Sequence, residues 1–88
     1  MLTWTIILFK RAQKDLRNLD RIMRVRVYEK LDWLAKNFES IPPTPLTADF
    51  AGICKLRVGD YRVLYRFDRD TKVIHVRGIE HRSKVYKK

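Results

Sequence analysis

The chain has 88 residues, 45% of them apolar and 11% aromatic, with only three glycines and three prolines, which excludes a disordered or low-complexity segment. This length suits one compact domain, so we expect residues 1–88 to fold as a single unit. The 20 Lys and Arg residues outnumber the 10 Asp and Glu residues and give a formal net charge of +10. A polyanion is the expected partner, with nucleic acid favoured over an anionic membrane or an acidic protein segment. A basic domain without a ligand is the alternative.

The cysteine content indicates a reducing compartment. Cys54 is the only cysteine, so no intramolecular disulfide can form, and no Cys/His cluster has zinc spacing. We therefore expect no metal and no cofactor. The apolar opening at residues 2–9 is shorter than the roughly 20 residues that span a bilayer, and it lacks the features of a signal peptide. The expectation is a cytoplasmic protein that has no membrane partner.

The first half of the chain predicts one strand and two helices. Residues 2–9 are rich in aromatic and β-branched side chains, which favour a strand in a central or well-covered position. Apolar residues then recur at spacings of three and four, as in amphipathic helices. Asp20 is the predicted N-cap of the second helix, and one bent helix is the alternative because neither Gly nor Pro marks the break. The apolar positions are Phe9, Ala12, Leu16 and Leu19, then Met23, Val27, Leu31, Leu34 and Phe38.

Prolines end the second helix. Proline removes a backbone donor and restricts the residue before it, so this helix must stop before Pro42, and residues 40–52 are predicted to be a loop. The polar faces of both helices carry cations, which either lie in solvent or contact a phosphate or a partner. These cations are Lys10, Lys14, Arg17, Arg21, Arg24, Lys30 and Lys36.

The second half of the chain predicts three antiparallel strands. Gly59 and Asp60 form a two-residue turn between the first two, with Gly59 suited to the first central position of a type II′ turn. A turn of this length pairs Arg57 with Arg62 and fixes the register of the hairpin. A second turn falls at residues 68–71. The strands are residues 53–58, 61–67 and 72–79.

Alternation gives this sheet one apolar face and one cationic face. The apolar face, expected to pack on the helices, collects Cys54, Leu56, Val58, Tyr61, Val63, Tyr65 and Phe67. The cationic face collects Lys55, Arg57, Arg62, Arg66, His75 and Arg77. Opposed arginines repel, and either a bound anion relieves that repulsion or the charged heads spread into water. The predicted fold class is therefore α+β, with an N-terminal strand, two helices or a helical hairpin, and three further antiparallel strands packed by the helices on one face.

The tail of the chain carries residue types suited to RNA cleavage, namely His81, Arg82 and Tyr86. RNA supplies its own nucleophile, the 2′-hydroxyl, so the protein needs only a base, an acid and cations for the developing phosphorane charge. A histidine transfers protons near neutral pH, and a tyrosine stacks on a base or donates a proton. The alternative for His81 and His75 is an ordinary surface position, and Cys54 is expected in the core.

Two stretches carry a resemblance to a known family. They are residues 55–65, KLRVGDYRVLY, and residues 81–86, HRSKVY. Both resemble the RelE/ParE superfamily of type II toxins, and more closely its RelE branch, and the order of elements is similar over nearly the whole chain. RelE-like members are ribosome-dependent endoribonucleases that cut messenger RNA in the aminoacyl site and are neutralised by a small antitoxin. ParE-like members instead inhibit DNA gyrase.

The resemblance also implies roles for individual residues. Lys55, Arg57 and Arg62 would contact or stabilise the phosphate and Arg82 would assist. Tyr86 would stack on or activate the substrate, and His81 would be the base or the acid. The expected catalytic set is therefore Lys55, Arg62, His81, Arg82 and Tyr86, and together with the other cations of the sheet and tail the expected RNA-binding set is Arg57, Arg66, Arg77 and Lys84.

The sequence departs from the family pattern at Ile53, where a lysine is expected, and at Glu80, where an arginine is expected. The leading hypothesis is a metal-independent messenger-RNA endoribonuclease toxin. A ParE-like gyrase inhibitor is the second, and a translation inhibitor that binds the ribosome or RNA without cutting is the third, suggested by the two departures. The implied partners are the ribosome, messenger RNA and a cognate RelB-like antitoxin whose acidic amphipathic helix covers the cationic surfaces.

Overall fold

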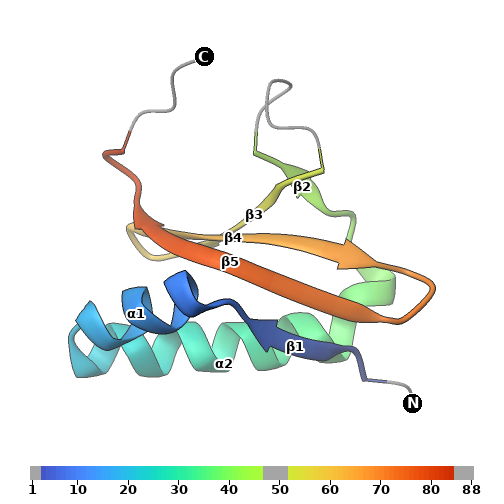
Figure 1. Cartoon of the computed structure of the whole chain (residues 1–88), viewed down its shortest axis with the longest axis horizontal. Coiled ribbons are helices and arrows are strands. Elements are labelled where there is room, and N and C mark those ends of the chain that lie inside the picture. The colour runs from blue at the N-terminus through green and yellow to red at the C-terminus, as the bar shows by residue number, and fades with distance from the viewer. Residues whose placement is uncertain (1–2, 47–51, 85–88) are drawn as a thin grey trace.

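One mixed five-stranded sheet forms the centre of the molecule (Figure 1). The computed structural model describes residues 3–46 and 52–84. Within them the strands follow the order β1, β5, β4, β3, β2, with β1 parallel to β5 and the other neighbours antiparallel. The strands are β1 (Thr5–Leu8), β2 (Thr44–Pro45), β3 (Cys54–Val58), β4 (Tyr61–Asp68) and β5 (Val73–His81). The predicted α+β fold and its three consecutive antiparallel strands are confirmed.

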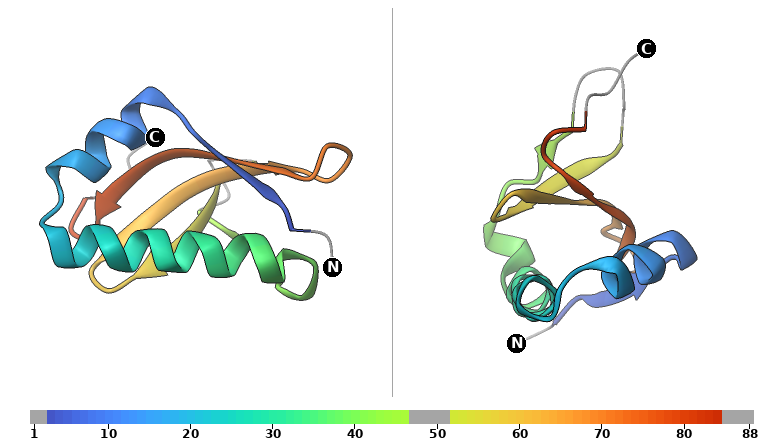
Figure 2. Two further views of the ribbon diagram at one scale, coloured as in Figure 1. Left: turned by 90° about the horizontal axis from the view of Figure 1, so that it is seen from below. Right: turned by 90° about the vertical axis from the view of Figure 1, so that its left-hand side faces the viewer.

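Two separate helices follow β1. The elements are α1 (Lys10–Asn18), α2 (Arg21–Asn37) and a short 3₁₀ turn, η1 (Phe38–Ser40). The backbone is extended at Leu19 and Asp20, and the Asp20 carboxylate accepts a 2.8 Å hydrogen bond from the Met23 N–H, as predicted for an N-cap. The alternative of one bent helix is therefore wrong. Both helices lie on the same side of the sheet, as predicted (Figure 2).

Arg24 closes the junction between the helices. Its guanidinium donates to the carbonyl oxygens of Leu16 at 3.1 Å and Leu19 at 2.9 Å. Both carbonyls lie at the end of α1, where the Leu16 carbonyl also accepts the Leu19 N–H at 3.2 Å, and a cation there complements the helix dipole. Arg24 therefore has a structural role that its place among the polar-face cations did not indicate. In the described part of the chain no helix is both long and apolar enough to cross a membrane.

The core lies between the helices and the inner face of the sheet. Its buried strand residues are Cys54, Val58, Val63, Tyr65, Ile74, Val76 and Ile79, and the helical segment adds Ala12, Leu16, Leu19, Val27, Leu31, Leu34, Ala35 and Phe38. Phe38 lies 4.4 Å from Trp4 and 5.0 Å from Phe67 between ring centroids. Burial raises the pKa of the Cys54 thiol, so this cysteine is a neutral core residue, as expected. Phe9 is the exception to the predicted apolar stripe, because it precedes α1 and is exposed.

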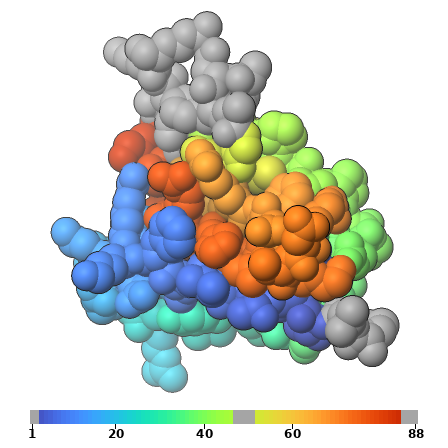
Figure 3. All heavy atoms as spheres, turned by 45° about the vertical axis from the view of Figure 1, so that its right-hand side comes forward, coloured from blue at the N-terminus to red at the C-terminus, as the bar shows by residue number. Residues whose placement is uncertain are grey.

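The two outer strands correct the sequence prediction. β1 is an edge strand rather than a central one, and it lies beside β5 although the two are far apart in the sequence (Figure 3). Its side chains alternate between exposed and half-buried, because one face packs inward and the other meets solvent. The predicted loop at residues 40–52 contains β2, which pairs with β3 at the opposite edge. An edge position tolerates Pro45, since its missing N–H removes no central ladder bond.

Candidate functional site

Four cationic side chains line a pocket of about 430 Å³ on the outer face of the sheet, the face away from the helices. They come from three separate segments: β3, β4 and the chain just after β5. We call this site the basic pocket, and its lining residues are Thr44, Lys55, Arg57, Arg62 and Arg82. The structure thus brings together three members of the expected catalytic set and one of the expected RNA-binding set.

Strand register is what places these charges side by side. Arg57 lies directly opposite Arg62, and Lys55 is two residues away on the same face of β3. The turn between the strands has Gly59 at φ +58°, whereas Asp60 has no positive φ, which fits the predicted type II′ turn. Opposed cations destabilise a hairpin, and a bound anion removes that cost. The pocket is therefore suited to a phosphate.

Short contacts fold the tail back onto the hairpin. The Arg82 N–H donates to the Asp60 carbonyl at 2.7 Å, and the Arg82 Nε lies 3.5 Å from the Asp60 carboxylate. Arg62 donates from Nη2 to the Lys84 carbonyl at 2.9 Å. Asp60 thus positions a site arginine, a role that sequence reasoning missed. Its only signal was an acidic residue in the turn beside the predicted site.

A β-bulge in β5 decides which tail residues reach the outer face. Leu64 pairs with Gly78, but the next residue, Tyr65, pairs with Val76, so Arg77 is an extra residue in β5. Side chains alternate along a strand, and one extra residue moves every later side chain to the other face. Simple alternation, which the sequence suggested for this strand, therefore holds only up to the bulge.

Compared with simple alternation, the bulge puts Glu80 on the outer face of the sheet and His81 on the inner face. Glu80 lies opposite Arg62 on the outer face, and only 7% of it is exposed. His81 lies opposite Tyr61, towards the helices, with the two rings perpendicular and 5.2 Å apart. His81 is therefore outside the lining of the basic pocket, although it stands next to Arg82 in the chain.

His81 has a local partner for each protonation state. Its Nδ1 accepts the Ser83 N–H at 3.1 Å and lies 2.8 Å from the Ser83 hydroxyl oxygen. A neutral ring accepts the N–H at Nδ1 and carries its proton on Nε2, whereas a protonated ring donates from Nδ1 to the hydroxyl oxygen. Both contacts hold the ring through Nδ1.

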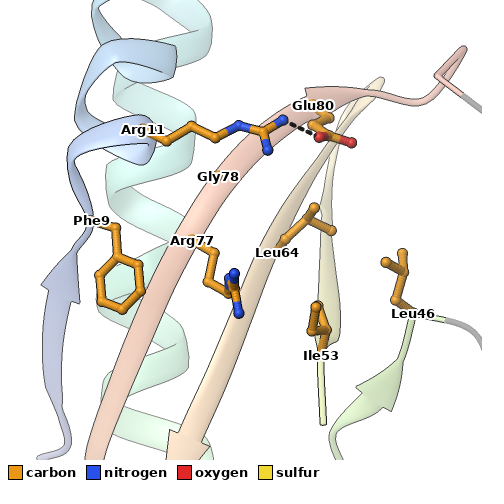
Figure 4. A pocket seen from close by; sticks show the side chains of 8 residues that line it. All are labelled: Phe9, Arg11, Leu46, Ile53, Leu64, Arg77, Gly78 and Glu80. Atoms are coloured by element: carbon orange, nitrogen blue, oxygen red, sulfur yellow. Dashed lines mark hydrogen bonds and ion pairs between the residues drawn. The ribbon is translucent and has the colours of Figure 1, made fainter. Parts of the chain in front are cut away.

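α1 fastens the part of β5 that follows the bulge (Figure 4). The Asp15 carboxylate accepts the Ile79 N–H at 2.9 Å, and the Arg11 guanidinium binds the Glu80 carboxylate. Gly78 lies beneath both contacts, because a Cβ there would stand 3.2 Å from the Asp15 oxygen. A side chain at Gly78 would therefore press on the Asp15 carboxylate that accepts the Ile79 N–H.

A second, more apolar pocket of about 390 Å³ lies beside this contact (Figure 4). Its lining residues are Phe9, Arg11, Leu46, Ile53, Leu64, Arg77, Gly78 and Glu80. Both departures from the family pattern, Ile53 and Glu80, thus line one pocket. Arg77 lines this pocket and not the basic pocket, and Arg66 is exposed opposite His75.

Lys84 and Tyr86 are the remaining residues of the expected site. Lys84 contacts the site through its carbonyl oxygen, and its Nζ lies 3.6 Å from the Glu80 carboxylate. Tyr86 lies outside the described residues. Within residues 3–46 and 52–84, no group of three or more His, Cys, Asp or Glu residues could hold a metal ion.

Comparison with known proteins identifies the family. A family model described as the ParE toxin of type II toxin–antitoxin systems, parDE, matches residues 6–86. The chain belongs to this toxin family. It is therefore a member of the RelE/ParE superfamily, as its sequence indicated. No curated protein matches the toxin.

Solved structures support the same assignment. The toxin–antitoxin complex RelBE2 from Mycobacterium tuberculosis has a chain with a TM-score of 0.80 at 26% identity, and the match covers 91% of this toxin and 99% of that chain. The archaeal RelE–RelB complex from Pyrococcus horikoshii OT3 gives a TM-score of 0.71 at 25% identity, covering 96% and 100%. The isolated E. coli RelE toxin shares the fold, with a TM-score of 0.72 at 18% identity over 93% and 87%.

Proposed function

We propose that this toxin is a ribosome-dependent, metal-independent endoribonuclease that cuts messenger RNA. The observation that carries the proposal is the basic pocket, where Lys55, Arg57, Arg62 and Arg82 meet on one face of the sheet. A site of this kind suits a phosphodiester with charge developing on its oxygens. A ribosomal target implies that the toxin acts in the cytoplasm.

The proposed reaction uses the 2′-hydroxyl of the RNA itself. A base takes the proton from this hydroxyl as the 2′-oxygen attacks the neighbouring phosphorus. The bond from phosphorus to the 5′-oxygen then breaks, and that oxygen takes a proton from an acid. The products are a 2′,3′-cyclic phosphate and a 5′-hydroxyl end. The cations of the basic pocket bind the non-bridging oxygens, and they bind more strongly as negative charge builds up in the transition state.

Two residues are proposed for the proton transfers. His81 is supported by the resemblance of the HRSKVY stretch and by its place next to Arg82 in the chain, while its ring lies on the inner face of the sheet. Tyr86 is supported by the resemblance of the HRSKVY stretch. Single-turnover cleavage separates them, because only the variant that lacks the proton-transferring group should cleave slowly: His81→Gln if the imidazole transfers the proton, and Tyr86→Phe if the phenol does.

The test of the proposal is primer extension on a message translated by purified ribosomes. The toxin should create new 5′ ends within translated codons, and Arg62→Ala should slow the cleavage by about 100- to 1,000-fold. Arg69→Ala is the matched control, since this arginine lies in the turn after β4 and pairs with Glu39 instead. Equal cleavage by all three proteins would contradict the role of the basic pocket. An uncut message under normal translation would contradict the nuclease itself.

We further propose a cognate antitoxin as the partner. Complexes named RelBE2 and RelE–RelB are among the similar structures, and they support a partner of the RelB type. An acidic amphipathic helix complements a toxin with a net charge of +10. Co-expression with an acidic protein encoded next to the toxin should restore growth, and continued toxicity with a verified complex would count against occlusion of the site.

A gyrase inhibitor is the second candidate, because the matching family model is described as a ParE toxin. It predicts that DNA supercoiling fails in the presence of the toxin while messages stay uncut. A non-cleaving translation inhibitor is the third, supported by Ile53 and Glu80 in place of basic residues. It predicts arrested translation without new RNA ends and with normal supercoiling.

A further inference from the structure

A groove of about 390 Å³ adjoins the basic pocket and shares one residue with it, Arg57. Its opposite wall is α2, which contributes Arg26, Lys30 and Trp33, and its base is the β3–β4 turn at Gly59. We call this site the α2 groove. Arg57 is thus the residue that links the basic pocket to the α2 groove.

Trp33 is the unusual residue of the α2 groove. It is 41% exposed, whereas Trp4 is 3% exposed in the core. The Lys30 Nζ lies 4.0 Å from the centroid of the Trp33 ring, which holds a positive charge against the indole. An exposed aromatic ring beside cations is the arrangement that binds single-stranded nucleic acid, because any base can stack on the ring while cations bind the backbone.

Arg26 connects the indole to the basic pocket. Its guanidinium lies against the β3–β4 turn, where a Cβ at Gly59 would stand 3.3 Å from Nη1. The absence of a side chain at Gly59 therefore makes room for this cation. Glu29 is the acidic residue of the lining, so three cations outnumber one carboxylate.

We infer that the α2 groove binds the single-stranded RNA next to the nucleotide held in the basic pocket, with a base stacked on Trp33 and phosphates on Arg26 and Arg57. The inference rests on the proposed function for the identity of the ligand as RNA. It adds a stacking subsite that extends the contact beyond the scissile phosphate. A protein partner docked on Trp33 is the competing explanation, which the test below distinguishes.

The probe is a single-stranded RNA of about eight nucleotides, within the usual range for such sites. Its 2′-oxygens are methylated, so it cannot be cut through a 2′-hydroxyl. Binding should quench the emission of Trp33, and the Trp33→Phe variant, which keeps only the buried Trp4, should show no quenching. Trp33→Ala should weaken binding of a labelled probe by about 5- to 150-fold, and Trp33→Phe should keep most of the affinity. Tyr28→Ala is the matched control, because Tyr28 is an exposed aromatic residue of α2 outside this groove.

The salt dependence of RNA binding distinguishes the stacking contribution of Trp33 from the charge contribution of Arg26. Arg26→Ala should reduce the slope of log affinity against log salt by about 0.7, whereas Trp33→Ala should lower affinity and leave the slope unchanged. Thermal unfolding of each variant checks that the fold is intact.

The outcomes distinguish this inference from the nuclease. Quenching by the probe without cleavage of any message would support RNA binding in the α2 groove and contradict the proposed endoribonuclease activity. Normal cleavage by wild type and Trp33→Ala, with no quenching and no loss of affinity, would overturn the groove and leave the endoribonuclease standing. Quenching by the antitoxin but not by RNA would also overturn it, in favour of a protein contact.

Discussion

The pair formed by Arg11 and Glu80 should be the strongest single electrostatic contact between α1 and the sheet. The Glu80 side chain is 6% exposed, and the Arg11 side chain, which is 59% exposed, reaches it across Gly78 (Figure 4). Glu80→Gln keeps the shape and one acceptor oxygen but removes the charge. We expect this change to loosen α1 from β5 and to lower the free energy of unfolding.

The magnitude follows from the exposure of the two partners. A hydrogen bond to a charged group contributes about 1.5–3 kcal/mol, whereas an exposed ion pair contributes about 0–1 kcal/mol. The buried carboxylate places this pair near the first range, and the exposed guanidinium reduces it through solvent screening. We expect a coupling energy of about 1–2 kcal/mol. For a chain of this size, losing that much free energy of unfolding corresponds to a fall of several degrees in Tm and of roughly 1 M in the urea midpoint.

The assay is a double-mutant cycle measured by urea unfolding, with Arg11→Gln, Glu80→Gln and the double variant. The chain offers a matched control in Asp32 and Lys36, an i,i+4 pair on α2 whose side chains are 63% and 59% exposed. Its coupling should be about 0.3–0.5 kcal/mol and should vanish in high salt. The coupling between Arg11 and Glu80 should keep more than half of its value under the same conditions.

A coupling at the Arg11–Glu80 pair no larger than that of the control pair would refute this reasoning. It would mean that Arg11 and Glu80 interact no more strongly than two exposed charges, despite the burial of Glu80. The attachment of α1 would then depend mainly on the Asp15 contact with the Ile79 N–H.

Three further outcomes follow from single residues. Gly59→Ala should cost about 1–3 kcal/mol in thermal unfolding, because Gly59 has φ +58° and an added Cβ would lie 3.2 Å from Met23 and 3.3 Å from Arg26; an unchanged Tm would contradict the strained turn. Burial raises the pKa of Tyr65 from 10.0 to about 12, so the folded state holds this proton more tightly than the unfolded state does. About 2–3 kcal/mol of stability should therefore be present below pH 10 and be lost as the pH rises to 12, and Tyr65→Phe should remove that loss in urea unfolding. Asp20→Ala should cost about 1 kcal/mol by removing the N-cap of α2, and Asp20→Asn, which keeps the acceptor oxygen, should recover most of it.

The elements that the sequence predicted well are those set by local patterns. The apolar spacing of both helices, the cap at Asp20 and the two-residue turn at Gly59 depend on neighbours in the chain, and the turn alone fixes the opposition of Arg57 and Arg62. The edge position of β1 depends instead on a parallel pairing with β5, which no local pattern records. β2 is missed for a similar reason, since its two residues form a strand only because β3 lies beside them.

The candidate site was predictable only up to the bulge. Cations on regular strands fall where alternation places them, so the basic pocket matches the expectation for Lys55, Arg57 and Arg62. The extra residue in β5 depends on how that strand meets β4 and α1, and it moves His81 to the inner face and Glu80 to the outer face. Composition has the same limit, because a net charge of +10 does not say which cations bind a ligand and which support the fold.

The distribution of cations shows how the fold separates these two tasks. Arg24 donates to two carbonyls at the end of α1, and Arg11 binds Glu80, so these two cations support the fold. Arg57 and Arg62 face each other across a hairpin, where like charges cost stability, and Arg62 also donates from Nη2 to the Lys84 carbonyl. An anion bound between them relieves this repulsion, whether it is an RNA phosphate or a carboxylate of an antitoxin. The RNA phosphate and the antitoxin carboxylate would therefore occupy the same place between the two arginines. Binding of one should exclude the other at the basic pocket.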